Sequence, residues 1–429
     1  MKQIALTAAV LLAPSIAFAQ SEQPDAPAGA PAATETAPAA APKAAPEKAP
    51  PPFSLGRADT GRPGKSPYAT DTQFGHPPAV YVIPMEGFMG VDIHPVVYDK
   101  ILKDVKEKKP DLIVFRLASS DGRMVEKYME AMNEAMKDDR IDPRRLASGI
   151  TDYRDLAAKL HNELDQYPCV MYVNDARGVS CVYALAWPYM YMSPEARVAG
   201  LDIVGSLGGG NDADIKAKMF SAWTGIAKGI LELGGRPQEL SDALVRPDRR
   251  LSCDLDGRST KWRGDTNGSW YVIDQSDEVS ARFDSKAAED TGLTDGIATD
   301  MTDLMVLLGY PEFTKIDSGE KIYKDMNTAW RKKYAESKKK MEQFQEPVED
   351  IKDLNNRRAI LDWMQQAFKQ SPQFAKMWEW TRGLTDDQLK LLKEQIDEQI
   401  RAANKQKQQQ GSGGKSGGKG FGGGLGGGR

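Results

Sequence analysis

The stretch Pro168–Gly200, PCVMYVNDARGVSCVYALAWPYMYMSPEARVAG, decides the expected fold. It opens with the apolar run Cys169–Val173, which has the length of one buried strand and is followed by turn residues. A Gly-Val-Ser-Cys turn then leads into Val182–Trp187, which is apolar on every side and therefore predicts a buried helix. A second apolar run, Met190–Met192, follows. This order can present a nucleophile at a helix N-terminus, or it can be a plain α/β crossover whose turn contains a serine.

Two further strands precede this stretch. The runs Ala79–Pro84 and Leu112–Leu117 are short and apolar, so each predicts one buried strand. Between them, Pro95–Lys108 carries apolar residues at helical spacing, and a leucine stripe between positions 156 and 164 marks a second helix. Alternating strands and helices predict parallel βαβ units with right-handed crossovers. Ligands bind such sheets where the strands end.

The chain beyond this stretch continues with helices and a β-rich segment. Asp214–Leu233 predicts one long helix. Residues 248–283 hold three candidate strands around Asn267-Gly268, a dipeptide typical of two-residue hairpin turns. Ser285–Leu308 returns to a helix–strand–helix pattern. We therefore expect an α/β core with a small β insertion at 248–283.

Five segments of the chain, in this order, resemble one protein family. They are the stretch quoted above, VYVIPMEGFMG, DLIVFRLASSDGR, KMFSAWTGIAKGILELGGRPQELSDALV and FDSKAAEDTGLTDGIATDMTDLMVLLG. Together they resemble the core of ClpP-class serine proteases of the NfeD and signal-peptide-peptidase A kind, over residues 79–310. The resemblance implies a ClpP/crotonase-like fold of repeated ββα units. It also implies a serine nucleophile activated by a lysine, an oxyanion hole of backbone N–H groups, and no cofactor.

The resemblance assigns roles to individual residues. Counting back from the Gly-Arg pair after the long helix places the family's lysine on Lys218. A count without a gap places the nucleophile on Gly178, whereas a shorter helix places it on Ser180. Gly122 and Gly178 are the oxyanion-hole candidates. The expected catalytic pair is therefore Ser180 and Lys218.

This pair needs a particular environment to work. A serine is activated by a neighbouring base, and an amine is a base near neutral pH only if desolvation lowers its pKa. The apolar residues Val179, Val182 and Phe220 are expected to supply that desolvation for Lys218. Each oxyanion donor then stabilises the transition state by roughly 3 kcal/mol.

The two ends of the chain predict export and low-complexity tails. Residues 1–19 have the positive end, apolar region and Ala-Phe-Ala site of a cleaved signal peptide. Residues 20–78 are an Ala/Pro-rich segment that is expected to be disordered. This segment is either a tether that gives peripheral contact with a membrane or envelope protein, or a spacer that only keeps the chain soluble. Residues 311–407 predict a helical extension with charged helices, and 408–429 a disordered Gly-rich tail. The expected location is the periplasm.

Composition narrows the range of partners. The formal net charge of −4 gives no electrostatic reason to expect nucleic acid. The three histidines, His76, His94 and His161, show no ligand spacing, so no metal site is expected. The sequence therefore predicts an exported Ser/Lys peptidase that acts on polypeptides and forms homo-oligomers. The alternative is an inactive scaffold or peptide-binding protein of the same fold.

Overall fold

The computed structural model describes residues 76–119, 150–201, 213–256, 259–276 and 279–412. These ranges all lie in the second of two compact units, Pro50–Arg429. The expected signal peptide and the candidate Gly122 fall outside them, as does most of the expected linker and tail.

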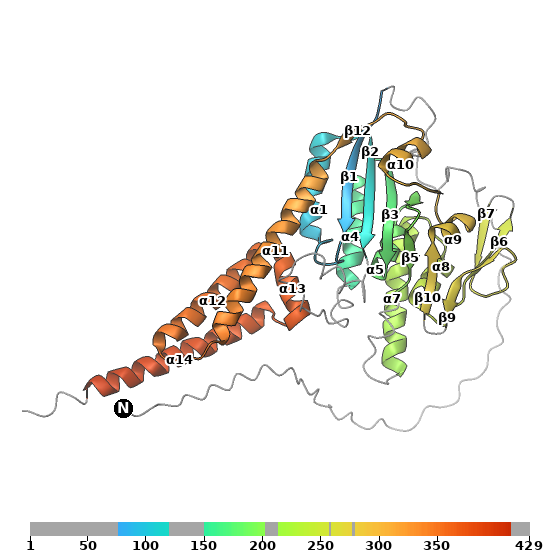
Figure 1. The fold of residues 1–429 in the computed structure, drawn as a ribbon. Helices are drawn as coiled ribbons and strands as arrows, with labels where there is room; N and C mark the ends of the chain where they lie inside the picture. Colours follow the sequence, from blue (N-terminus) through green and yellow to red (C-terminus); the bar gives the residue numbers. More distant parts are fainter. Residues whose placement is uncertain (1–75, 120–149, 202–212, 257–258, 277–278, 413–429) are drawn as a thin grey trace, which may run out of the picture. The chain divides into compact units, whose positions relative to one another are not determined.

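A nine-stranded, mostly parallel sheet forms the centre of this unit (Figure 1). Its main path runs in the order β12-β1-β2-β3-β5-β10-β9, and β4 pairs with β3 and with β11. The strands are β1 (Ala79–Glu86), β2 (Leu112–Ser119), β3 (Cys169–Arg177), β4 (Met190–Met192), β5 (Arg197–Ala199), β9 (Asp274–Ser276), β10 (Val279–Asp284), β11 (Gly296–Ile297) and β12 (Thr314–Ile316). Among the described strands of this sheet, the antiparallel pairs are β10 with β5 and β10 with β9. The α/β class predicted from the sequence is confirmed.

Strand β3 is longer than the sequence predicts. The register between β2 and β3 shifts after Leu117, so that Ala118 faces Asp175. This shift keeps the polar residues Asn174 and Asp175 inside the strand instead of in a turn. The following helix, α5 (Val179–Ala184), begins three residues before the expected Val182, so that Gly178 alone separates the strand from the helix.

Helices cover both faces of the sheet (Figure 1). One large apolar core joins a sheet face to α1 (Pro95–Lys108), α4 (Ile150–Leu164), α5, α7 (Ala213–Leu233) and α8 (Gln238–Val245). A smaller core on other strand residues is closed by α10 (Met301–Leu307). Helix α9 (Ser285–Asp290) follows β10 directly. Buried runs such as Val80–Ile83 supply side chains to both faces, which explains their continuous apolar character.

The β-rich segment folds differently from the expected hairpin. A separate sheet has the order β7-β6-β8, from β6 (Ser252–Asp256), β7 (Ser259–Arg263) and β8 (Tyr271–Val272). Both outer strands pair with β6, so Asn267-Gly268 does not join two paired strands, and the hairpin prediction is wrong. A Cβ on Gly268 would lie 2.6 Å from the backbone of Cys253. Glycine is therefore needed here for a close approach, whereas the sequence pattern suggested a turn.

A helical extension follows β12, and its helices form a further apolar core that also takes in Phe88 and Val91 from the loop between β1 and α1. The extension consists of α11 (Ser318–Gln345), α12 (Ile351–Gln370), α13 (Pro372–Arg382) and α14 (Asp386–Ser412). The expected capping box forms before α14: Gln388 N donates to Thr385 Oγ1, and Thr385 N donates to Gln388 Oε1. Helix α14 packs on α12, and its apolar stripe lies in the extension's core. Within the described ranges, no helix is long and apolar enough to cross a membrane.

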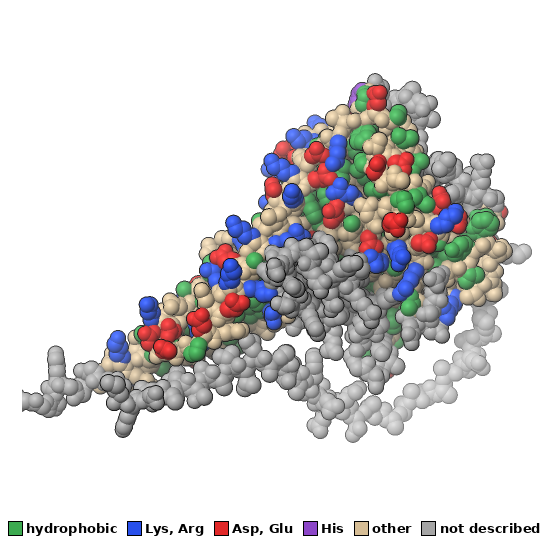
Figure 2. All heavy atoms as spheres, in the orientation of Figure 1, with side chains coloured by type: hydrophobic (Ala, Val, Ile, Leu, Met, Phe, Trp, Pro, Cys, Tyr) green, Lys and Arg blue, Asp and Glu red, His purple; other side chains and the backbone are tan. Residues whose placement is uncertain are grey.

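The surface of the extension carries charges of both signs. Figure 2 shows Lys and Arg side chains interspersed with Asp and Glu on the face in view. Some of these charges pair across helices, as Arg358 on α12 does with Asp397 on α14 at 2.7 Å. Such exposed pairs add little stability, so the extension depends mainly on its apolar core.

Candidate functional site

The carboxyl ends of β1, β2 and β3 meet at one edge of the sheet. Glu86, the last residue of β1, faces Ala118, and Ser119, the last residue of β2, faces Ala176. The turn after β3 leads directly into α5, which carries Ser180. This edge is where open parallel sheets bind ligands, so the structure places the predicted nucleophile at a suitable position.

Ser180 is fully buried in this turn. Its exposed fraction is 0%, and its hydroxyl lies 2.7 Å from Ser119 O and 2.9 Å from Arg177 O. A hydroxyl has one proton to donate, so these two carbonyls share it. The serine thereby joins the ends of β2 and β3 to the first turn of α5. A nucleophilic serine instead directs this proton to a base.

Gly178 forms the sharp turn between β3 and α5. Its φ of 73° and ψ of −134° fall in a region that is essentially restricted to glycine. Its N–H donates to Ala199 O of β5 at 3.0 Å. The amide that the sequence suggested for the oxyanion hole therefore already has a backbone partner in this conformation.

Lys218 lies on the exposed, N-terminal half of α7. Its side chain is exposed, whereas Trp223, Ala227 and Ile230 further along the helix are buried in the core. Helices α7 and α5 are in contact, so the two predicted catalytic residues lie on neighbouring helices. Both hydrogen bonds recorded for the Ser180 hydroxyl run to backbone carbonyls and neither runs to Lys218. The expected desolvation of the amine is also missing, because the side chain is exposed. The catalytic roles of Ser180 and Lys218 stay predictions.

The loop between β1 and α1, residues 87–94, was not singled out from the sequence. Asp92 in this loop is fully buried, accepts a hydrogen bond from Phe88 N at 3.0 Å, and pairs with Arg331 of α11 at 2.7 Å. Burial raises the pKa of Asp92, and the charge of Arg331 opposes that rise. No local pattern reveals this pair, because its members are far apart in the chain.

His94 closes the same loop as the N-cap of α1. Its Nδ1 accepts from Val96 N at 3.2 Å. Burial lowers the pKa of His94 to about 4, so the ring stays neutral and keeps an acceptor nitrogen at neutral pH. The histidine therefore has a structural role, and Pro95 after it was the sequence signal for a helix start.

In the described part of the chain, no three His, Cys, Asp or Glu side chains lie close enough together to hold a metal ion. Cys169, Cys181 and Cys253 are not joined to one another by disulfides, and burial raises the pKa of Cys253 to about 11. A thiol with such a raised pKa is a poor nucleophile at neutral pH.

The described fold and site define an α/β protein whose candidate site lies at the carboxyl edge of a parallel sheet. Similar solved structures include a serine-to-alanine mutant of 1510-N, a membrane-bound stomatin-specific protease. The two sequences are 13% identical, the match covers 54% of this chain and 85% of that chain, and the TM-score is 0.33. A lysine-to-alanine mutant of 1510-N in complex with a substrate peptide is 12% identical, over 53% and 78% of the two chains, with a TM-score of 0.30.

A third similar structure is the 1510-N membrane protease specific for a stomatin homolog from Pyrococcus horikoshii. It is 12% identical, over 53% of this chain and 77% of that chain, with a TM-score of 0.28. No protein-family model matches the sequence, and neither does any curated protein.

Proposed function

We propose that this chain is an exported scaffold or peptide-binding protein with a peptidase-like α/β core, and that it does not hydrolyse peptide bonds. The observation that carries this proposal is the state of the Ser180 hydroxyl, which is fully buried and shared between two backbone carbonyls. In this state the oxygen is closed to a substrate carbonyl, and its proton is directed to backbone carbonyls instead of to Lys218.

Activation of this serine would require several changes at once. The hydroxyl would have to leave both carbonyls, and Ser119 O and Arg177 O would then be buried acceptors with one partner fewer. A buried polar group that loses its partner costs about 1–3 kcal/mol. The Gly178 N–H would also have to leave Ala199 O before it could stabilise an oxyanion. The described conformation therefore favours binding over catalysis.

A polypeptide is the class of ligand that we propose for this edge of the sheet. The residue pattern resembles enzymes that act on polypeptides, and one similar structure, of 1510-N, holds a substrate peptide. Periplasmic location, peripheral contact with the envelope and homo-oligomer formation belong to the same proposal. They follow from the expected signal peptide, the Ala/Pro-rich segment and the family resemblance.

A Ser/Lys peptidase is the second candidate function. The contact between α5 and α7 favours it, because these two helices carry Ser180 and Lys218. This function requires a second conformation in which the serine is turned outward and the lysine is desolvated beside it.

Incubation with an unfolded polypeptide distinguishes the two candidates. We expect saturable binding of fluorescently labelled, reduced and carboxymethylated lactalbumin, measured by anisotropy, with no fragments after a long incubation. Wild type, Ser180→Ala and Lys218→Ala should behave alike on gels. Fragments produced by wild type and by neither variant would establish the peptidase instead, and a lack of saturable binding would contradict the proposed function.

A further inference from the structure

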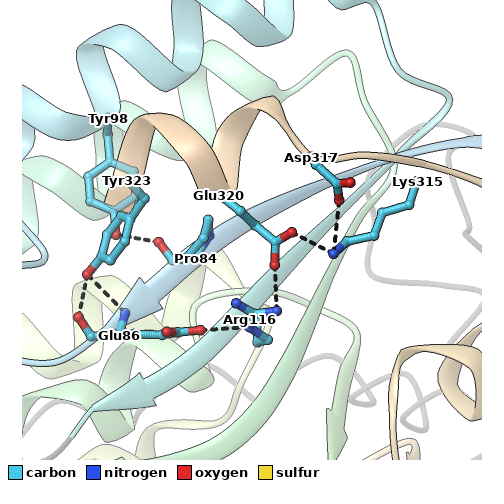
Figure 3. A network of polar contacts seen from close by, with 8 residues as sticks. All are labelled: Pro84, Glu86, Tyr98, Arg116, Lys315, Asp317, Glu320 and Tyr323. Carbon is cyan, nitrogen blue, oxygen red and sulfur yellow. Dashed lines mark hydrogen bonds and ion pairs between the residues drawn. The ribbon is translucent and has the colours of Figure 1, made fainter. Parts of the chain in front are cut away.

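A side chain of helix α11 binds the backbone of Glu86, the last residue of β1. The buried Tyr323 hydroxyl accepts a hydrogen bond from Glu86 N at 3.1 Å and donates one to Glu86 O (Figure 3). One phenol group thus satisfies both polar backbone atoms of Glu86. The approach of α11 to β1 is close, since a Cβ on Gly319 would lie 2.6 Å from Val82 O.

The side chain of Glu86 is held by the same helix through an ion-pair network. Arg116 of β2 donates from Nε to Glu86 at 2.7 Å and from Nη1 to Glu320 of α11 at 2.6 Å. Lys315 adds a contact of 2.5 Å to Glu320 (Figure 3). The side chains of Arg116 and Glu320 are only partly exposed, so their ion pair is screened less by solvent than a surface pair. Glu86 is therefore fixed to α11 by both backbone and side chain.

A path of covalent bonds and hydrogen bonds leads from Glu86 to Ser180. The next residue, Gly87, donates its N–H to Ala118 O at 3.0 Å and accepts from Ser119 Oγ at 2.7 Å. Ser119 O in turn accepts from the Ser180 hydroxyl at 2.7 Å. Ser119 is 2% exposed and Ser180 0%, so water does not compete for these bonds. The path runs from α11 to the end of β1, then to the end of β2 and on to α5.

We propose that Tyr323 is a positioning residue through which the helical extension controls the Ser180 turn. A partner or a displacement that moves α11 would change the position of Glu86 and Gly87, and with them the carbonyl that holds the Ser180 hydroxyl. The inference rests on the proposed function only in taking the Ser180 turn as the site. The coupling that it describes is a property of the protein without a bound ligand.

Two tyrosines form a matched pair for the test. Tyr98 of α1 is buried beside Tyr323, with ring centroids 6.5 Å apart, and donates to Pro84 O of the same strand at 3.0 Å (Figure 3). Tyr98→Phe and Tyr323→Phe each remove one buried hydroxyl and keep the ring. Of these two tyrosines, Tyr323 is the one that hydrogen-bonds the backbone of Glu86, from which the path to Ser180 begins.

Hydrogen exchange of the free, full-length protein measures the coupling. The reporters are the amides of Gly178 and Cys181, which donate to Ala199 O and Gly178 O across the Ser180 turn. Loss of the two hydrogen bonds between Tyr323 and Glu86 should speed the exchange of these amides by roughly fivefold in Tyr323→Phe. In Tyr98→Phe their exchange should stay near the wild-type rate.

Two results would overturn the inference. One is faster exchange near Glu86 with wild-type rates at Gly178 and Cys181, which would limit Tyr323 to a local role. The other is equal acceleration in both variants, which would reflect a general loss of stability. Neither depends on whether lactalbumin binds or is cleaved, so this test and the test of the proposed function fail separately.

Discussion

Replacing Gly234 with alanine is expected to lower the free energy of unfolding by about 3 kcal/mol or more. Gly234 follows the end of α7, and an added Cβ would lie 2.1 Å from Leu185 O and 3.0 Å from Ala186 C. Both atoms belong to the backbone just after α5, so no side-chain rotation relieves the clash. Either α7 or the segment after α5 must move. Urea unfolding of Gly234→Ala against wild type measures the loss.

Gly229, which lies within α7 itself, is the control. Gly229 lies on the exposed side of α7, and an added Cβ would meet nothing within 4 Å. Gly229→Ala should therefore stabilise the protein by about 0.5–1 kcal/mol through helix propensity. Equal effects of the two substitutions would contradict the close contact between the end of α7 and the segment after α5.

Replacing Arg331 with leucine is expected to destabilise the protein by about 3–5 kcal/mol at pH 8. The substitution leaves the carboxylate of Asp92 fully buried without its countercharge. Burial already raises the pKa of Asp92, and loss of Arg331 should raise this pKa further. A carboxyl group with a raised pKa in the folded state favours folding more as the pH falls. The deficit should therefore shrink from pH 8 to pH 5.

The exposed pair between Arg358 and Asp397 provides the comparison. Arg358 is 46% exposed, and exposed ion pairs contribute about 0–1 kcal/mol. Arg358→Leu should thus cost less than about 1 kcal/mol at pH 8. If Arg331→Leu were equally mild at pH 8, the buried pair would not anchor the β1–α1 loop to α11.

Much of the core was predictable from short apolar runs. The starts of β1, β2 and β3 and the whole of β4 agree with the pattern, because buried parallel strands need continuous apolar sequence. The pattern failed at the end of β3, where Asn174 and Asp175 stay in the strand. Their place depends on a register shift against β2, which one strand's own sequence does not encode.

The position of Ser180 was predictable from the sequence, whereas the hydrogen-bond partners of its hydroxyl were not. Ser180 lies at the strand-to-helix turn that the sequence indicated, but its partners are carbonyls on β2 and β3. The contact between Tyr323 and Glu86 joins residues 237 positions apart. Such long-range contacts arise from tertiary packing, so neither local periodicity nor residue spacing reveals them.

The central claim is that Ser180 is a structural serine. The most direct measurement is the intact mass of the protein after treatment with a fluorophosphonate, for wild type, Ser180→Ala and Lys218→Ala. The buried, carbonyl-bonded hydroxyl predicts no adduct on Ser180 in any of the three proteins. One adduct on wild type, mapped to Ser180 and lost in both variants, would contradict this account and identify a Ser/Lys peptidase.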